Sequence, residues 1–511
     1  MYSSKRINFV TILILILFSL VIASSFDFIQ YAVDGGLVLE KKIIFPNNYN
    51  ILNYYYLNSW TALHQIVQIL IKFGFNIYQI SFLFLFLNTF ILGISIFLIL
   101  SVFNAKYQYN IFFTIIFLLL AKNFGDTEYP TLFYSEHSYG LISLSLSTLI
   151  IALVFNNFIN HAIFLSILLI SVHPIIGCWM VFLLLILLIL NKDIIKNKKK
   201  FLIYFFLSLI IILISFLFFL NTSDFIKEYD VTSYSIYMSM WDGHRYSEKI
   251  HYEYLFKSLI LFLAILFFKK INKKQKFFGL EFILIIIFCS YFLYFLGQFD
   301  FIRLIFPSII FSRFVLTFSI VGWPIILGIF IYFLNQKRFG LVFVVLLFTS
   351  IQANQIIKTI NQYYEDYSNV SYKFDKASSL EKSDIPSFAN RNDGYIVTTA
   401  SLERIIFSKL EQPLLLYLSS FDMIPYHKYL SLNLKNILEE IYQVNFTSPP
   451  IKNNPSLSDE VIFDKLNAIS LDKWNFLFKK YNIKAVIVPS NFDLKLDLIK
   501  EIKKIKIYTI N

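Results

Sequence analysis

KNKKKFLIYFFLSLIIILISFLFFL, residues 196–220, joins a basic cluster to twenty almost uniformly apolar residues. A helix rises about 1.5 Å per residue, so a run of this length reaches across the roughly 30 Å hydrocarbon core of a bilayer. Lysines directly before such a run are typical of a cytoplasmic loop, because basic residues accumulate on that side of a membrane. The stretch therefore predicts a membrane-spanning helix that begins at the inner face.

Apolar runs of this kind recur along the 511-residue chain, which is 57% hydrophobic and only 15% charged. These proportions exclude an ordinary water-soluble globular protein. The fold class that we expect is an α-helical polytopic membrane protein with about eleven transmembrane helices. The expected spans are 8–26, 80–103, 109–121, 138–156, 161–172, 174–191, 201–220, 254–270, 277–297, 314–334 and 340–356.

The distribution of charge narrows the classes of binding partner that we expect. A net charge of +12 would suit nucleic acid, but the lysines cluster in short loops between apolar runs. That distribution favours attraction to anionic membrane lipids, and we expect no nucleic-acid partner. Cys178 and Cys289 both lie inside apolar runs, so neither a disulfide nor a zinc or iron–sulfur site is expected.

The basic clusters also set the topology. With eleven spans, 196–200, 269–276 and 336–338 fall on the same side as Lys5 and Arg6, and the positive-inside rule makes that side the cytoplasm. Richness in Ile, Phe, Asn and Lys indicates an AT-rich bacterial genome, so we expect the bacterial inner (cytoplasmic) membrane. The outer, periplasmic or extracellular side then receives the loops 27–79, 122–137 and 221–253 and everything after 356.

Composition changes near residue 360. We therefore expect a transmembrane domain, 1–360, and a small soluble α/β domain on the outer side, 361–511. Alternation and β-branched residues predict its strands, and helical periodicity predicts its helices. The expected strands are 394–401, 484–490 and 505–510, and the expected helices are 427–443, 470–481 and 492–504.

The first outer loop contains the candidate catalytic carboxylates, Asp34 and, second to it, Asp27. A carboxylate held near a membrane surface can act as general base on an acceptor hydroxyl. The alternative is an ordinary solvated loop in which Gly35-Gly36 makes a turn. Farther along, the aromatic and amphipathic stretch 54–73 predicts a helix that lies in the membrane interface.

Other polar residues gather on the same expected side. Candidate substrate-binding residues are Asp126, Glu136, His137, His173, Trp241, His244 and Arg245. His173 precedes Pro174 at an expected helix–helix corner, and Trp241 would stack on a sugar face. Arg303 and Arg313 are candidates for donor phosphate binding, because guanidinium groups match phosphate oxygens. The alternative for Arg313 is an ion pair with a carboxylate such as Asp300.

This layout resembles the GT-C superfamily of membrane glycosyltransferases, in which a first span precedes a large outer loop with an acidic residue and an interfacial helix. In that likeness Asp27 or Asp34 takes the acidic position. The adjacent Asp-Glu pair of the family is absent, since SSFDF (24–28) and AVDGG (32–36) each hold one Asp. The pieces SVHPIIG (171–177), WDGHR (241–245), FPSIIFSR (306–313) and LDKWNFLFKKYNIKAVIVP (471–489) also resemble a group of uncharacterised bacterial membrane proteins.

The resemblance implies transfer of a sugar from a polyprenyl-phosphate-linked donor to a glycan, lipid or protein acceptor on the outer face, usually with inversion. No metal motif is present, although the outer carboxylates would permit a divalent cation. Two other functions stay open: a transporter or flippase for a lipid-linked or anionic solute, and a non-enzymatic envelope scaffold. Convergence of Asp34, His137, Arg245 and Arg313 on one outward-facing cavity would favour the enzyme.

Overall fold

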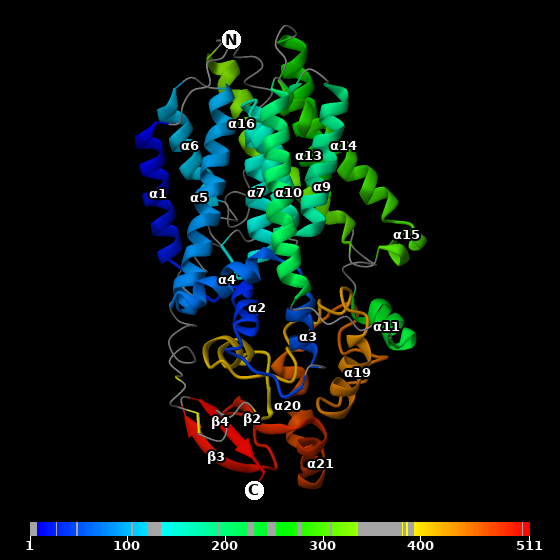
Figure 1. The fold of residues 1–511 in the computed structure, drawn as a ribbon. Helices are drawn as coiled ribbons and strands as arrows, with labels where there is room; N and C mark the ends of the chain where they lie inside the picture. The colour runs from blue at the N-terminus through cyan, green and yellow to red at the C-terminus, as the bar shows by residue number, and fades with distance from the viewer. Residues whose placement is uncertain are drawn as a thin grey trace.

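The computed structural model describes most of the chain. The described residues are 8–26, 28–47, 50–103, 106–120, 134–191, 194–195, 197–221, 229–242, 252–272, 277–306, 309–335, 381, 385–386, 393–502 and 504–510. The chain is mostly helical, with one small sheet near its C-terminus. A bundle of long helices occupies one end of the molecule in Figure 1, and the sheet lies at the other end.

Ten of the eleven expected apolar runs are helices, and the run at 340–356 lies outside the described residues. By length and composition, five helices of the described chain could cross a membrane unaided: α5, α7, α10, α14 and the segment Arg313–Asn335. The ten helices are α1 (Phe9–Ser24), α5 (Ile77–Phe103), α6 (Tyr107–Leu120), α7 (Ser138–Phe155), α8 (Ile159–Val172), α9 (Pro174–Leu190), α10 (Lys198–Leu220), α13 (Tyr252–Ile271), α14 (Phe278–Leu296) and α16 (Leu316–Asn335).

Local chemistry sets the corner between α8 and α9. Pro174 occupies the first turn of α9, where no backbone N–H is required, and the His173 ring accepts a hydrogen bond from the Ile176 amide over 3.4 Å. Gly177 allows the two helices to approach closely, since a Cβ there would lie 2.3 Å from the Ile170 nitrogen. The expected helix–helix corner at His173-Pro174 is confirmed.

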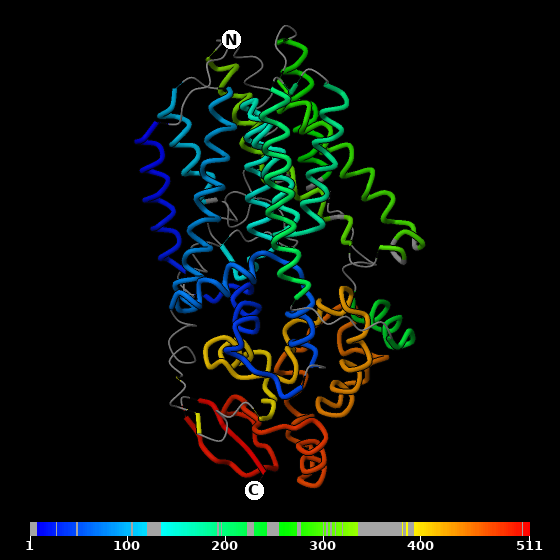
Figure 2. The backbone as a smooth tube through the Cα atoms, in the orientation of Figure 1, coloured from blue at the N-terminus to red at the C-terminus, as the bar shows by residue number. Residues whose placement is uncertain are grey.

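Three short helices lie between the bundle and the C-terminal region (Figures 1 and 2): α2 (Tyr31–Leu39), α3 (Ile51–Asn58) and α4 (Ala62–Lys72). The expected interfacial helix at 54–73 is thus two helices. They are separated at Thr61, whose hydroxyl accepts from the Leu63 amide over 3.2 Å and donates to the Val172 carbonyl over 2.8 Å. The turn considered for Gly35-Gly36 is wrong, because both glycines lie inside α2 and pack against α4.

The C-terminal sheet has the strand order β1-β2-β4-β3. Strands β1 (Tyr395–Thr398) and β2 (Ile483–Pro489) are parallel, whereas β4 (Ile505–Thr509) pairs antiparallel with both β2 and β3 (Asp497–Ile502). The crossover from β1 to β2 contains a π-helix at Ile405–Lys409 and the helices α19 (Leu430–Glu440), α20 (Asp459–Ala468) and α21 (Leu471–Tyr481).

The expected helix at 492–504 is wrong. Residues 497–502 form β3, an edge strand whose side chains are mostly exposed. Lys504 has a φ of 69°, and this left-handed residue begins the return into β4. Pairing with the following strand therefore overrides the helical spacing of Leu496, Ile499 and Ile502.

One hydrophobic core joins the C-terminal region to segments expected as outer loops. The core includes Leu52 and Val67 from α3 and α4, Trp241, and Leu434 and Ile487 of the C-terminal region. The expected domain boundary near residue 360 lies outside the described residues. The described C-terminal region is therefore built around earlier parts of the chain rather than folded on itself alone.

Candidate functional site

Asp34 lies on the first turn of α2, and its side chain is 1% exposed. Its carboxylate accepts hydrogen bonds from Arg404, from Ser408 over 2.6 Å, from Tyr417 over 3.2 Å and from Tyr56 over 3.4 Å. Burial raises the pKa of Asp34, while Arg404 and the three hydroxyl groups oppose that rise. We call these five residues the Asp34 network.

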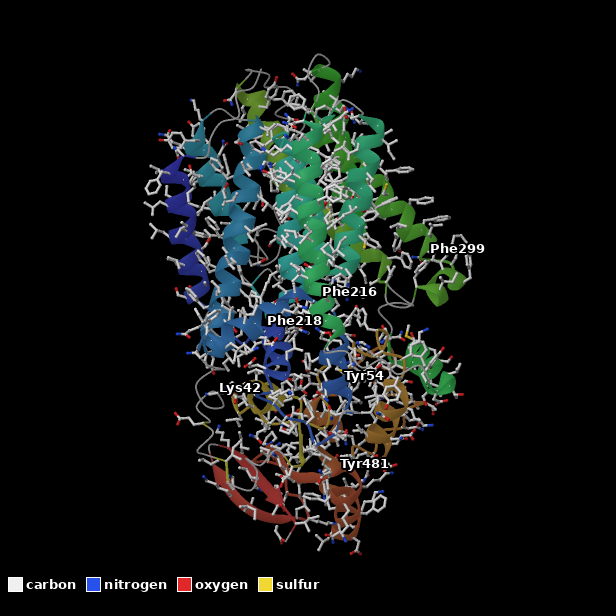
Figure 3. The ribbon with its side chains drawn as sticks, in the orientation of Figure 1. Lys42, Tyr54, Phe216, Phe218, Phe299 and Tyr481 are labelled. Atoms are coloured by element: carbon white, nitrogen blue, oxygen red, sulfur yellow. The ribbon has the colours of Figure 1, made fainter. Side chains whose placement is uncertain are left out.

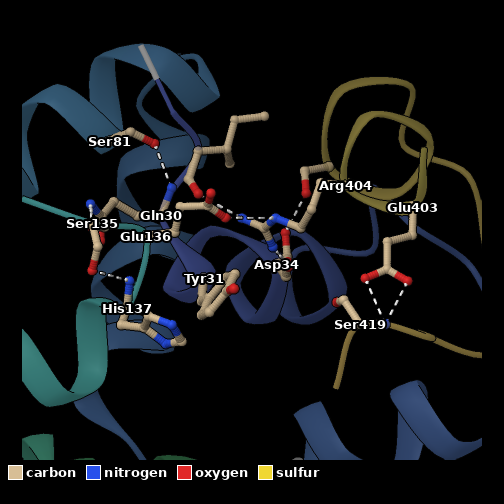
Figure 4. A network of polar contacts seen from close by, with 12 residues as sticks. Gln30, Tyr31, Asp34, Ser81, Ser135, Glu136, His137, Glu403, Arg404 and Ser419 are labelled. Atoms are coloured by element: carbon tan, nitrogen blue, oxygen red, sulfur yellow. Dashed lines mark hydrogen bonds and ion pairs between the residues drawn. The ribbon is translucent and has the colours of Figure 1, made fainter. Parts of the chain in front are cut away.

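Arg404 connects the Asp34 network to its surroundings (Figure 4). Besides Asp34, it donates to the Ile29 carbonyl over 2.6 Å and lies 3.8 Å from the Glu136 carboxylate. Its guanidinium also lies over the ring of Tyr31, 4.6 Å from the centroid. Burial works against the charge of Arg404, but Asp34 raises its pKa above the ordinary value. The pair therefore holds α2 against the C-terminal region.

Glu136 and His137 lie immediately before α7, next to the start of α2. The Glu136 carbonyl accepts from the Tyr31 amide over 2.9 Å, and the His137 ring meets the Tyr31 ring edge-on at 4.7 Å. The Glu136 carboxylate is about two-fifths exposed. Burial raises the pKa of Glu136, Arg404 lowers it and Asp34 raises it further. A carboxyl group that is both accessible and perturbed is a candidate for proton transfer.

A small pocket of about 50 Å³ lies where α7 and α9 begin. Its polar lining includes His173, Arg313, Ser143 and Tyr426. We call it the junction pocket, because Tyr426 comes from the C-terminal region and the others from the apolar bundle. Its volume equals that of a few water molecules, so it accommodates a small polar group.

His137 connects the two arrangements electrostatically. Burial lowers the pKa of His137 to about 4, Asp422 opposes this, and Arg313 and Arg404 reinforce it. A neutral imidazole can accept a proton or orient a hydroxyl group. Glu136, His137, His173, Arg313 and Asp34, all expected from sequence, thus lie in neighbouring arrangements at one end of the bundle. Asp34 nevertheless faces the Asp34 network rather than the junction pocket.

Several partners were not expected from sequence. Arg404, Ser408, Tyr417, Asp422 and Tyr426 all come from the C-terminal region, far along the chain from Asp34. The one local signal is SLERIIFSK (401–409), where Arg404 sits within an apolar, helix-like stretch. An arginine in such a setting requires a carboxylate partner, but the stretch does not say which one.

Trp241 does not belong to the site. The sequence favoured a role in stacking on sugar, but the ring is fully buried, stacks on Phe446, and donates to the Phe446 carbonyl over 2.8 Å. Its large apolar area instead fills the core shared with the C-terminal region. Other candidates lie outside the described residues or side chains: Asp27, Asp126, His244, Arg245, Asp300 and Arg303.

Within the described part of the chain, no group of three or more His, Cys, Asp or Glu residues is arranged to hold a metal ion. Comparison of the chain with protein-family models, with curated proteins and with solved structures gives no match.

Proposed function

We propose that the chain is an integral protein of the bacterial inner membrane, with its N-terminus in the cytoplasm and its C-terminal region outside. Helix α10 supports this most strongly, because only 6% of its 18-residue apolar stretch is buried within the protein. Phe216 and Phe218 point outward from it (Figure 3). A helix of 23 residues with so much exposed apolar surface is unfavourable in water and favourable in lipid.

We further propose that the protein is a glycosyltransferase of the GT-C kind, using a polyprenyl-phosphate-linked sugar. The observation that carries this is the junction pocket, where Arg313 and His173 meet Tyr426 at the boundary between apolar helices and the C-terminal region. The phosphate of a membrane-embedded lipid lies at the level of such a boundary. Arg313 offers several N–H donors to that phosphate, and the apolar bundle would accommodate the polyprenyl chain.

Glu136 is the general base that this geometry favours. Its carboxylate would take the proton from an acceptor hydroxyl, whose oxygen then attacks the anomeric carbon. The bond from that carbon to the phosphate oxygen breaks, and polyprenyl phosphate leaves with the bonding electrons. Asp34 as base stays a prediction that the geometry disfavours, since its oxygens are buried and already accept four hydrogen bonds.

The test is transfer of labelled sugar from a panel of polyprenyl-phosphate sugars to a cell-envelope extract, with the full chain in lipid nanodiscs. Loss of a general base lowers turnover by about 100-fold or more, so Glu136→Gln is expected to lose that much. Glu440→Gln is the matched control, because Glu440 pairs with Lys480 on the surface of the C-terminal region. Equal turnover by Glu136→Gln and wild type would remove Glu136 from the mechanism.

A non-enzymatic envelope scaffold is the second candidate. The observation that favours it is the sequestered carboxylate of Asp34 together with the small volume of the junction pocket. A scaffold would show no transfer from any donor while its C-terminal region still bound an envelope component.

A further inference from the structure

A second, larger pocket lies within the C-terminal region and shares no lining residue with the junction pocket. Its volume is about 270 Å³, near the lower end of the range for small-ligand sites. The polar part of its lining is Ser419, Asn454, Ser456 and Ser458, and we call it the serine pocket. Ala400, which follows β1, lies on its wall, so the pocket opens at the carboxyl end of a strand in a parallel pair.

The walls of the serine pocket are fixed by hydrogen bonds in the free protein. The Phe421 amide donates to the Pro455 carbonyl over 2.7 Å, and the Leu457 amide donates to the Leu418 carbonyl over 2.8 Å. These two bonds hold the loops that carry Ser419 and Ser456 side by side. A preformed pocket of this kind binds a ligand without the cost of ordering a loop.

Hydrogen bonds also fix the part of the wall that Ala400 and Ser458 form. Ser401 donates to Asp459, at the start of α20, through its hydroxyl over 2.5 Å and its amide over 3.1 Å. Ser458, the N-cap residue of α20, makes no capping hydrogen bond with its side chain. The loop after β1 and the first turn of α20 are thus held together, and the Ser458 hydroxyl is not used in capping the helix.

The lining indicates the kind of ligand. None of the residues that line this pocket in the described chain is charged or aromatic. Hydroxyl groups and an amide both donate and accept hydrogen bonds, as the hydroxyls of a sugar require. Pro450 and Ile451 add apolar surface that suits the C–H face of a sugar ring. The nearby charges of Asp459 and Glu460 are negative, which disfavours an anion.

We propose that the serine pocket binds one neutral saccharide residue of a cell-envelope glycan. This site lies outside the junction pocket, and the inference does not depend on the proposed sugar transfer. Binding here would fix the C-terminal region to a glycan whether the protein is an enzyme or a scaffold. Saccharide binding without turnover, and turnover without saccharide binding, are therefore distinguishable results.

The experiment uses the full chain in lipid nanodiscs free of glycoside detergent. Saturation-transfer NMR is recorded with N-acetylglucosamine, methyl glucopyranoside and methyl galactopyranoside, and an array adds neutral and phosphorylated glycans. Ala400→Trp fills the pocket and is expected to weaken binding at least tenfold. Leu471→Trp is the matched control, because it places the same side chain at an exposed position on α21.

Ser458→Trp is the second variant, since Ser458 is exposed and folding does not depend on its side chain as a cap. Loss of binding in both pocket variants, with the control unchanged, supports the site. The inference is overturned if wild type binds no neutral saccharide, if it binds phosphorylated glycans alone, or if both pocket variants bind as wild type does.

Discussion

At the residue scale, Asp34→Asn tests what the buried carboxylate does. The substitution removes the charge of the carboxylate that lies nearest to the Arg404 guanidinium, which is 20% exposed and then keeps only Glu136, at 3.8 Å, as a charged partner. Breaking a largely buried ion pair from one side costs about 3 kcal/mol of unfolding free energy, so we expect a clear fall in Tm. The measurement is thermal unfolding of purified protein in lipid nanodiscs.

The control for Asp34→Asn is Asp493→Asn, which breaks the pair with Lys506 at a side chain that is 92% exposed. Exposed pairs contribute little, so its Tm should stay close to that of wild type. The double variant Asp34→Asn/Arg404→Gln should lose less than the two single losses combined, because it removes both charges. An unchanged Tm in Asp34→Asn would contradict a stabilising role and return Asp34 to the list of candidate bases.

Glu403 makes the stability of the protein depend on pH. It is fully buried, accepts hydrogen bonds from the Leu418 and Ser419 amides, and burial raises its pKa to about 7. The folded chain therefore keeps a proton that the unfolded chain releases near pH 4.5. Stability should fall by about 3 kcal/mol as the pH rises from 4.5 through 7.

Glu403→Gln replaces the titrating group by a neutral amide of the same shape. The difference in Tm between pH 5 and pH 8 should therefore be smaller in the variant than in wild type. Thermal unfolding at both pH values checks this. An identical pH dependence in the two proteins would show that Glu403 is already charged at pH 5.

Asp34 is recognisable in the sequence as a candidate site residue, but its surroundings are not. A lone Asp beside two glycines indicates a polar feature of some kind at this position. Its main partners, Arg404, Ser408 and Tyr417, lie about 370 to 380 residues away, as their hydrogen bonds record. No local pattern reports contacts over such a distance, so the sequence alone does not predict that folding buries Asp34 in an ion pair.

At the scale of elements, Gly36→Ala tests the packing of α2 on α4. A Cβ at Gly36 would lie 2.1 Å from Val67 Cγ1 and 3.1 Å from the Gln68 nitrogen. Helix α2 must therefore shift away from α4, and overpacking of this kind costs about 1–3 kcal/mol. Thermal unfolding should show a lower Tm than wild type.

Gly322→Ala in α16 is the matched control, because a Cβ there meets nothing closer than 3.5 Å. Alanine also favours a helix more than glycine does, so its Tm should equal or exceed that of wild type. If Gly36→Ala were as stable as Gly322→Ala, α2 and α4 would not be in close contact.

The elements differ in how far the sequence could predict them. Long apolar runs such as α5 and α10 were located closely, because their composition alone requires a helix in lipid or in a core. The aromatic residues and the amphipathic pattern of 54–73 predict one interfacial helix. The bond from the Leu63 amide to Thr61 is a local N-cap that starts α4, whereas the bond from Thr61 to the Val172 carbonyl is a tertiary contact that the local sequence does not report.

At the scale of the whole molecule, the loops that connect the bundle helices form two sets, one at each end of the bundle. The N-terminus of α10 lies at the end away from the sheet, and its C-terminal part meets α4, where Gln65 donates to the Ser215 carbonyl over 2.8 Å (Figure 1). The described parts of the three loops expected outside lie at the end that faces the C-terminal region. The alternation of apolar runs and basic clusters is sufficient to predict which loops lie at the same end of the bundle. It does not predict the hydrophobic core shared with the C-terminal region, because that core joins segments that are far apart in sequence.

That separation predicts the labelling of single cysteines in spheroplasts. In a background with Cys178→Ser and Cys289→Ser, we expect a membrane-impermeant maleimide to label Ser448→Cys, which is exposed in the C-terminal region. Lys199→Cys, exposed at the start of α10, should be labelled only after the membrane is permeabilised. Helix α10 begins at the end of the bundle away from the C-terminal region (Figure 1), and it is long and apolar enough to cross a bilayer. Labelling of both cysteines in intact spheroplasts would place both ends on one side and refute a membrane-spanning bundle, whereas labelling of Lys199→Cys alone would invert the orientation and move the junction pocket to the cytoplasmic face.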